Sequence, residues 1–266
     1  AFLLNYGGGK GCTQIFANGF HCHNYDDHPI NVDMQFLTIK PENSYASAGF
    51  SLGQIGRLDG INEKGLSVSL SWGAGELGTS PRLSAELFIR IILDRTSTIK
   101  EVIELYKEVG YGSPNNLLIS DATGEAIVIE NSSRTSAIRK LTYGEALYSA
   151  NRYLSESMKS EQKYRNPTTV WREEFIATNI PFSLSKSLQK ELLTTIYPNG
   201  LFEPYYKEEM GTLWSAIFEP EEKIATILLG ESKNQIQRII TLNNLVHSEL
   251  VEEISIVVPE DVTSSR

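Results

Sequence analysis

Apolar and polar residues alternate along much of the first third of the chain, and this period of two is typical of half-buried β-strands. The alternation is clearest in residues 30–39 and 66–72, and a turn-forming segment lies between them at 59–65. No helical period interrupts the run. We therefore expect a β-meander with strands at 12–20, 30–39, 45–50, 54–58 and 66–72.

Two amphipathic helices are predicted next. Residues 84–93 carry apolar side chains at 87, 88, 91 and 92, which places those side chains on one face of a helix. Thr98 and Glu101 have the spacing of a capping box, so a second helix is expected to begin there.

The remaining segments mix strands and helices. We expect hairpins over 116–130 and 212–229, strands near 135–140, 145–150 and 250–258, and helices within 155–195 and near 233–245. Helices that are segregated from antiparallel strands indicate an α+β fold. No repeat or linker divides the sequence, which favours one domain.

Composition narrows the class of protein. The chain has 266 residues, of which 41% are hydrophobic, and this is enough for a sizeable core. The net charge is −9 and no basic stripe is visible, which argues against binding to nucleic acid. No apolar run is long enough to span a bilayer. Two cysteines are too few for a disulfide framework, which favours a cytoplasmic protein.

The step Gly11-Cys12-Thr13 is the first candidate for chemistry. If the peptide bond before Cys12 is cut, one residue carries both a thiol and a free α-amine. Such an amine titrates near pH ~8, so it can accept the thiol proton. A cysteine at the start of a strand is otherwise most often a small buried hydrophobic residue, and this interpretation stays open on the step alone.

A polar cluster follows at residues 21–27. A strand, a turn and a returning strand would bring Asp26, fourteen residues further on, back beside Cys12. There its carboxylate could hold a protonated amine. The alternative is that Asn24, Asp26 and Asp27 are turn residues ahead of Pro29.

The same cluster also suggests a metal-dependent hydrolase that uses His21, His23 and His28. However, His21 and His23 would share one face of a strand while Cys22 points to the other. No second cluster of His or Cys occurs later in the sequence, so we expect no metal site.

Several segments, taken in order, resemble the acyl-coenzyme A:6-aminopenicillanic acid acyltransferase family and the related choloylglycine hydrolases and penicillin V acylases. All of these are N-terminal nucleophile hydrolases. The similar segments are Gly11-Cys12-Thr13 with residues 21–26, the turn at 59–66, residues 90–104, the hairpin 116–130, Ser149-Ala150-Asn151, and the hairpin 212–230.

The resemblance implies a four-layer αββα sandwich and self-cleavage between Gly11 and Cys12. Residues 1–11 are then the tail of a precursor segment, and residues 12–266 form a single domain. Cys12 matches the nucleophile, Asp26 the carboxylate beside its amine, and Asn151 the amide of the oxyanion hole. The backbone near Ser71 and Trp72 matches a second oxyanion donor less closely.

The sequence departs from the family pattern beside the predicted nucleophile. Cys22 stands where the family has Gly, and His23 stands where it has Arg or Gln. Contacts of His23 and Asn24 with substrate are therefore weaker predictions. Arg165 and Arg172 are candidates for a second functional arginine. These departures also motivate an alternative function, a binding module that kept the fold and lost the chemistry.

The function predicted from the resemblance is a zymogen that becomes a cysteine amidase or acyltransferase. It would act on a small acyl amide or thioester through a thioester at Cys12. Its other predicted partner is its own precursor segment, and a homo-oligomer stays open. We expect no cofactor and no nucleic acid or membrane partner.

Overall fold

The computed structural model describes residues 11–31, 33, 35–73, 75–78, 82–164, 167–181, 183–206, 210–242 and 254–255. Of the precursor tail predicted at residues 1–11, only Gly11 belongs to this part. Of the strand predicted near 250–258, only Ile254 and Ser255 do. Arg165, one of the two candidate arginines, lies outside the described residues.

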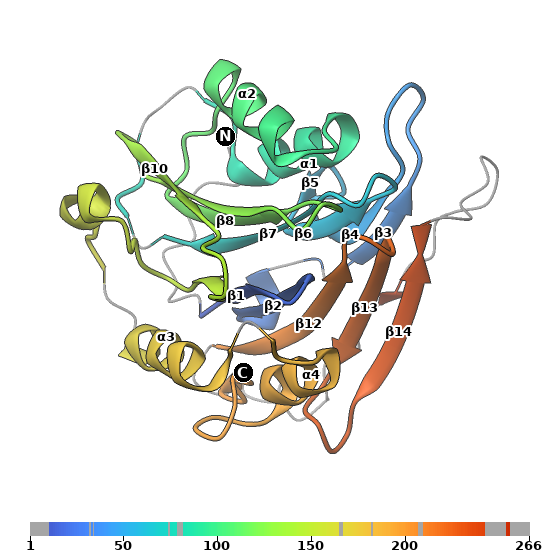
Figure 1. Cartoon of the computed structure of the whole chain (residues 1–266), viewed down its shortest axis with the longest axis vertical. Coiled ribbons are helices and arrows are strands. Elements are labelled where there is room, and N and C mark those ends of the chain that lie inside the picture. Colours follow the sequence, from blue (N-terminus) through green and yellow to red (C-terminus); the bar gives the residue numbers. More distant parts are fainter. Residues whose placement is uncertain are drawn as a thin grey trace.

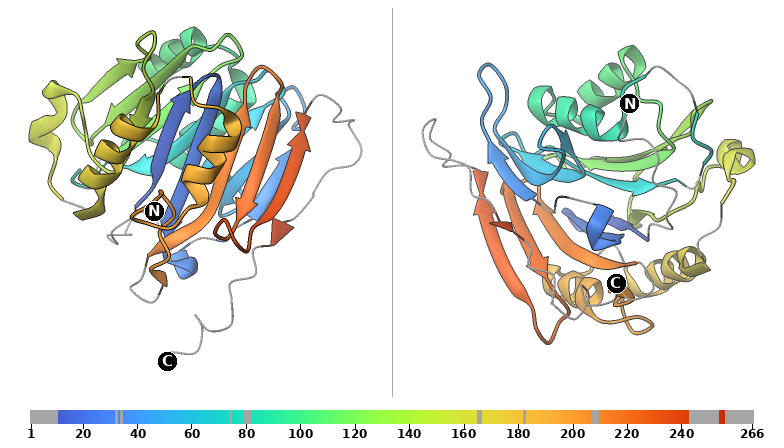
Figure 2. Two further views of the ribbon diagram at one scale, coloured as in Figure 1. Left: turned by 60° about the horizontal axis from the view of Figure 1, so that its bottom comes forward. Right: turned by 180° about the vertical axis from the view of Figure 1, so that it is seen from behind.

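Two antiparallel sheets face each other, and helices cover the outer side of both (Figure 1). Figure 2 shows the same layers from below and from behind, with α1 and α2 on one outer side and α3 and α4 on the other. The fold is therefore α+β, a four-layer αββα sandwich, and this prediction is confirmed.

Within the described residues, one sheet has six strands in the order β11-β1-β2-β12-β13-β14. Their bounds are β1 (Thr13–Ala17), β2 (Phe20–Asp27), β11 (Leu147–Ser149), β12 (Gly211–Glu219), β13 (Ile224–Leu229) and β14 (Ile236–Thr241). The paired strands β1 and β2 lie near the middle of this sheet, so both of their faces are buried.

The other sheet, over the same described ranges, has nine strands in the order β10-β9-β8-β7-β6-β4-β3-β15, with β5 paired to β4. Their bounds are β3 (Gln35–Ile39), β4 (Ser47–Leu52), β5 (Gly56–Arg57), β6 (Asp59–Asn62), β7 (Ser67–Trp72), β8 (Asn115–Ser120), β9 (Ala126–Asn131), β10 (Ser136–Lys140) and β15 (Ile254–Ser255).

The helices form the outer layers. They are α1 (Ala85–Arg95), α2 (Ile99–Glu108), α3 (Pro167–Asn179) and α4 (Lys186–Thr194), with short 3₁₀ helices η1 (Pro29–Asn31) and η2 (Glu156–Glu161). The predicted capping box is confirmed, because the Thr98 hydroxyl accepts from the Glu101 N–H and the Glu101 carboxylate accepts from the Thr98 N–H. On α1, Phe88, Ile89 and Ile92 are buried.

The strand predicted over 30–39 is shorter than expected, because residues 29–31 form η1 and β3 begins at Gln35. Two further sequence predictions are wrong. The strands built from residues 12–27 do not join the meander, because they lie in the opposite, six-stranded sheet. The helix predicted near 233–245 is replaced over 236–241 by β14. This is an edge strand whose residues are mostly exposed, so burial does not impose a strict alternation of apolar and polar positions.

The predicted turn before β7 depends on Asn62 and Gly65. The Asn62 side-chain oxygen accepts hydrogen bonds from the N–H groups of Lys64 and Leu66. Gly65 has a φ of +82°, and a Cβ there would lie 2.2 Å from the carbonyl oxygen of Pro220. Only glycine fits this position.

An aromatic stack fills the space between the sheets close to Cys12. The ring of Trp214 stacks on Tyr25 at 4.3 Å and on Phe50 at 3.8 Å between centroids. Cys12 belongs to the same buried cluster. The packing of these rings fixes the distance between the two sheets where the predicted nucleophile lies.

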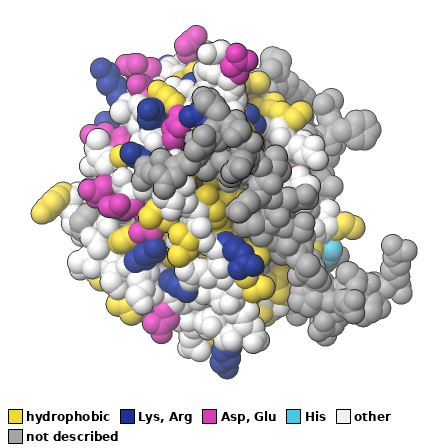
Figure 3. Space-filling view, turned by 90° about the vertical axis from the view of Figure 1, so that its right-hand side faces the viewer, with side chains coloured by type: hydrophobic (Ala, Val, Ile, Leu, Met, Phe, Trp, Pro, Cys, Tyr) yellow, Lys and Arg dark blue, Asp and Glu magenta, His cyan; other side chains and the backbone are white. Residues whose placement is uncertain are grey.

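On the face seen in Figure 3, Lys and Arg side chains lie among Asp and Glu side chains without a continuous basic patch among the described residues. None of the helices in the described ranges is long and apolar enough to cross a membrane.

Candidate active site

Cys12 lies directly before β1, at the point where β1 pairs with the end of β2. Its side chain is fully buried, and its Sγ lies 3.8 Å from the main-chain oxygen of Asp26. The N–H of Gly11 also donates to that oxygen at 3.4 Å. The β1–β2 hairpin thus brings Asp26 beside the Gly11–Cys12 bond, across fourteen residues of sequence.

The Asp26 carboxyl is completely buried and only half satisfied. Its Oδ1 accepts a hydrogen bond from Thr212 Oγ1 at 2.6 Å, whereas Oδ2 has no hydrogen-bond partner among the described residues. A Cβ at Gly11 would lie 3.2 Å from that Oδ2. Burial raises the pKa of Asp26 well above its usual range, Glu203 raises it further, and Arg172 opposes the shift.

Arg172, on α3, is fully buried, and its guanidinium donates to six oxygen atoms of Cys12 and of residues near it. Its guanidinium donates to Gly11 O (2.5 Å), Cys12 O (2.7 Å), Thr13 Oγ1 (2.9 Å), Asn151 Oδ1 (2.8 Å), Thr168 Oγ1 (3.3 Å) and Thr169 Oγ1 (3.2 Å). The carboxylate of Glu203 lies 3.4 Å from its Nε and supplies the counter-charge.

Asn151 follows the edge strand β11 and has a fixed amide orientation. Its Oδ1 accepts from Arg172, which can only donate, and its Nδ2 donates 3.1 Å to the Trp72 carbonyl oxygen, which can only accept. One N–H of the Asn151 amide is left for a further acceptor. The group of Trp72 that faces Asn151 is thus its carbonyl oxygen, an acceptor, whereas the sequence predicted a backbone donor near Ser71 and Trp72. The centroid of the Trp72 ring lies 5.5 Å from that of Tyr164.

His23 points into the space between the sheets and joins them. Its Nδ1 lies 2.9 Å from Asp59 Oδ2, and its Nε2 lies 3.2 Å from the main-chain oxygen of Leu70. Both partners only accept hydrogen bonds, so both bonds form together only when the ring carries both protons. Asp59 also accepts from Trp214 Nε1 at 2.8 Å and from the Phe50 N–H at 3.0 Å.

Replacing Asp59 by Ala is expected to lower the free energy of unfolding by about 3–5 kcal/mol, because it leaves the buried N–H groups of His23, Trp214 and Phe50 without their acceptor. Unfolding in urea measures this loss. Lys40→Ala, which removes a part-exposed pair with Glu63, is the control and is expected to leave the midpoint nearly unchanged. Equal midpoints for the two variants would contradict a stabilising role for the hydrogen bonds that Asp59 accepts across the sheets.

Asn24 does not join the group around Cys12, which consists of Cys12, Asp26, Asn151 and Arg172. Its side chain lies on the face of β2 opposite to that of His23, and its Nδ2 donates to the main-chain oxygens of Leu193 (2.9 Å) and Leu201 (3.0 Å). Cys22 lies on that side as well, with its thiol 3.0 Å from Gln189 Oε1.

The histidines that suggested a metal site have other partners. The two ring nitrogens of His21 are within hydrogen-bonding distance of the hydroxyls of Ser67, Ser69 and Ser120. Burial, and to a smaller extent His23, lower the pKa of His21 well below its usual range. The described residues contain no group of three or more His, Cys, Asp or Glu side chains that could hold a metal ion.

A cavity of about 750 Å³ opens beside Asn151 and Thr169. Its lining contains three basic side chains and no acidic one: Asn151, Arg152, Tyr153, Leu154, Lys159, Gln162, Lys163, Tyr164, Thr169 and Val170. Because Arg172 hydrogen-bonds both Asn151 and Thr169, this cavity adjoins the group around Cys12.

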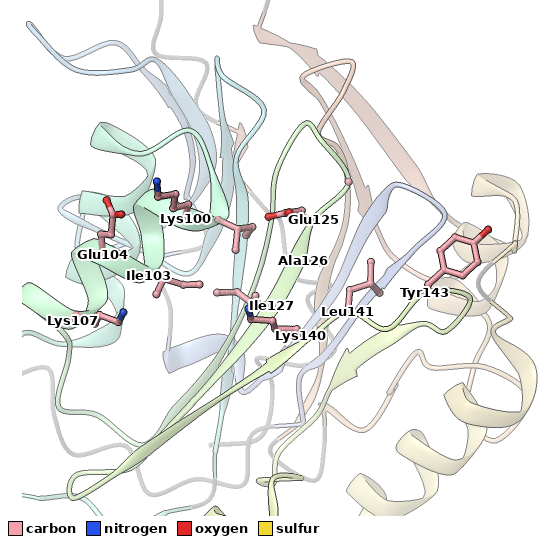
Figure 4. A pocket seen from close by; sticks show the side chains of 12 residues that line it. Lys100, Ile103, Glu104, Lys107, Glu125, Ala126, Ile127, Lys140, Leu141 and Tyr143 are labelled. Carbon is pink, nitrogen blue, oxygen red and sulfur yellow. The ribbon is translucent and has the colours of Figure 1, made fainter.

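A second hollow, of about 610 Å³, is unrelated to this site. In Figure 4 the side chains of Lys100, Ile103 and Lys107 on α2 lie across from those of Ile127 on β9 and Lys140 on β10. It lies on the outer face of the nine-stranded sheet, and none of the site residues predicted from the sequence lines it.

Comparison with known proteins identifies the fold and the family. The fold is that of the N-terminal nucleophile hydrolases. Residues 15–234 match the family model of acyl-coenzyme A:6-aminopenicillanic acid acyltransferase. The chain therefore belongs to that family, whose members are acyltransferases and amide hydrolases. A search of curated proteins finds no matching sequence.

The solved structures that share the fold include the following three. Penicillin V acylase from Agrobacterium tumefaciens is 17% identical with a TM-score of 0.55, and the match covers 88% of this chain and 87% of that chain. A mutant of conjugated bile acid hydrolase from Clostridium perfringens is 14% identical with a TM-score of 0.55, and the match covers 92% of this chain and 96% of that one. The N-acylethanolamine-hydrolyzing acid amidase ortholog of Caenorhabditis elegans is 16% identical with a TM-score of 0.54, over 79% and 93%.

Proposed function

We propose that the protein is a cysteine amidase that activates itself by cutting the peptide bond between Gly11 and Cys12. The observation that supports this most directly is the position of Arg172. Its Nη1 donates 2.5 Å to the carbonyl oxygen of Gly11, which is the oxygen that would become negative when the carbonyl carbon is attacked. A donor already in place there stabilises such an oxyanion without reorganisation.

The cut can be written with the residues present. The Cys12 thiol attacks the carbonyl carbon of Gly11, the thiol proton passes to the Cys12 nitrogen, and the C–N bond breaks as a thioester forms. Water then hydrolyses the thioester, which leaves Gly11 with a carboxylate and Cys12 with a free thiol and a free α-amine. On this proposal residues 1–11 are the end of a precursor segment, and residues 12–266 are one domain.

The free amine gives Asp26 a role. Asp26 Oδ2 is buried beside Gly11 without a partner among the described residues. An α-ammonium at Cys12 would supply the missing donor and a positive charge, and it would favour the ionised form of the carboxyl. The amine, held there, would accept the thiol proton in each later turnover.

In turnover, Cys12 Sγ attacks the carbonyl carbon of an acyl amide, and the remaining N–H of Asn151 donates to the oxyanion. The substrate amine leaves with the proton held by the α-ammonium. Water then hydrolyses the acyl thioester, or a second amine accepts the acyl group. The cavity beside Asn151 is the proposed site for the substrate, and its size suits a small molecule.

A panel of three amides tests the proposal: penicillin V, a conjugated bile acid and an N-acylethanolamine, chosen from the names of the structural relatives. Mass spectrometry is expected to detect a released amine for at least one of them and an acyl adduct on a peptide that begins with Cys12. A folded protein that stays uncut and releases no amine would instead favour the binding module.

Asn151→Ala is expected to lower kcat about 10²–10³-fold, because one oxyanion donor is lost. The variant should still be cut at Gly11–Cys12, since Arg172 supplies the donor for that step. Steady-state kinetics on the best amide of the panel and intact mass measure the two effects. An unchanged kcat would exclude Asn151 from the oxyanion site.

A further inference from the structure

The main chain around Asn151 is held by side chains of the opposite sheet. Asn116, on β8, is fully buried and faces the segment that follows β11. Its Nδ2 donates to the carbonyl oxygen of Ala150 at 3.1 Å and to that of Arg152 at 3.1 Å. A single amide group therefore binds the residues on both sides of Asn151.

A second donor comes from the neighbouring strand. Ser71, on β7, is the direct cross-strand partner of Asn116. Its hydroxyl donates to the same Ala150 oxygen at 2.7 Å, which is shorter than its distance of 3.3 Å to Gln14 Oε1. Both donors thus come from one pair of positions on the nine-stranded sheet.

This support matters because β11 has only three residues and lies at the edge of its sheet. Its ladder of hydrogen bonds to β1 covers residues 147–149 and stops before Asn151. Without the donors from the other sheet, the backbone at 150–152 would have to rely on neighbouring loops for its position. The Asn151 amide, in turn, has its oxygen and one N–H already bonded, which leaves one N–H with a defined direction.

We propose that Asn116, with Ser71 as a second donor, is a positioning residue that sets the direction of the free N–H of Asn151. This rests on the proposed function of Asn151 as an oxyanion donor. Neither residue is expected to touch the substrate, because both act through the main chain at Ala150 and Arg152.

Asn116→Asp tests the proposal, because it keeps the size of the side chain and removes the two N–H donors. We expect kcat on the best amide of the panel to fall about 10- to 100-fold with KM within about twofold, since a misplacement of about 1 Å costs on the order of 10²-fold in rate. Ser71→Ala is a smaller change, because it removes the shortest of three side-chain hydrogen bonds to Ala150 O and leaves those from Asn116 (3.1 Å) and Ser149 (3.4 Å). We expect a kcat loss of about threefold to tenfold. Ser71→Ala serves as the test if Asn116→Asp does not fold.

Asn62→Asp is the matched control. Asn62 is another buried strand residue whose Nδ2 donates to two main-chain oxygens, those of Leu93 (3.0 Å) and Thr96 (2.8 Å), at the end of α1. Its loss should lower stability to a similar degree and leave kcat within about twofold of the wild type. An equal fall in kcat in both variants would overturn the positioning role.

A double-mutant cycle separates positioning from general damage. If Asn116 acts through Asn151, the pair Asn116→Asp/Asn151→Ala should have the kcat of Asn151→Ala alone, within about threefold. Losses that multiply would overturn the proposal. A wild-type protein that turns over none of the amides would refute the proposed function itself, whereas an active wild type with an unaffected Asn116→Asp variant refutes only this inference.

Discussion

Replacing Cys12 by Ala is expected to abolish turnover of acyl amides and to leave the Gly11–Cys12 bond uncut. Both reactions use the same sulfur atom as nucleophile, and no other thiol lies beside that bond in the described part of the chain. Loss of a nucleophile typically lowers the rate on the order of 10³-fold or more. Intact mass and the amide panel measure the two reactions on one sample.

Cys22→Ala is the matched control for this variant. Cys22 is likewise a buried cysteine outside any disulfide, but its side chain lies on the face of the hairpin opposite to that of Cys12 and contacts Gln189. Burial raises the pKa of Cys22, so it stays a neutral thiol. We expect Cys22→Ala to be cut and to turn over amides at the wild-type rate. Turnover that survives in Cys12→Ala and is lost in Cys22→Ala would refute the assignment.

Arg172→Met is expected to lower the free energy of unfolding by about 3–5 kcal/mol and to stop the cut. The substitution leaves the buried Glu203 carboxylate without its cation, and it removes the donors to Gly11 O, Cys12 O and Asn151 Oδ1. Urea unfolding measures the first effect, and a time course of intact mass measures the second.

Arg172→Lys separates the charge from its geometry. A lysine keeps one positive charge, but its single ammonium cannot reproduce a planar guanidinium that binds the Gly11 and Asn151 oxygens at once. We expect this variant to fold, to be cut about 10- to 100-fold more slowly and to turn over amides poorly. Arg90→Met, which removes a part-exposed ion pair with Asp94 on α1, should leave both rates unchanged. Wild-type cutting by Arg172→Lys would show that the charge alone is sufficient.

The parts of the site that could be predicted from the sequence are local. Cys12 and Asp26 lie on one hairpin, so a strand, a turn and a returning strand are enough to bring them together. The capping box at Thr98 depends on residues three apart, so it could be predicted from the sequence as well. The fold class followed from the order of elements and from the family resemblance. The resemblance carries information on long-range contacts, because the members of a family share one fold.

The residues that complete the site come from distant segments. Arg172 lies 160 residues from Cys12, and no spacing near it distinguishes it from other helical arginines. Glu203 and Asn116 carry even less signal, because their roles depend on packing between layers. The wrong prediction at β14 shows that a local pattern can also favour the wrong element. Ile236, Ile239 and Ile240 have helical spacing, and only the pairing with β13 makes them a strand.

The unpartnered oxygen of Asp26 gives the proposed cut a direction. In the uncut chain this buried carboxyl oxygen lacks a hydrogen bond from the described residues, which is a cost that the fold carries until a donor arrives. The amine created by the cut would provide that donor and an ion pair with it. The cut form would then be more stable than the uncut chain. The ion pair would thus oppose re-formation of the peptide bond, and maturation would run in one direction.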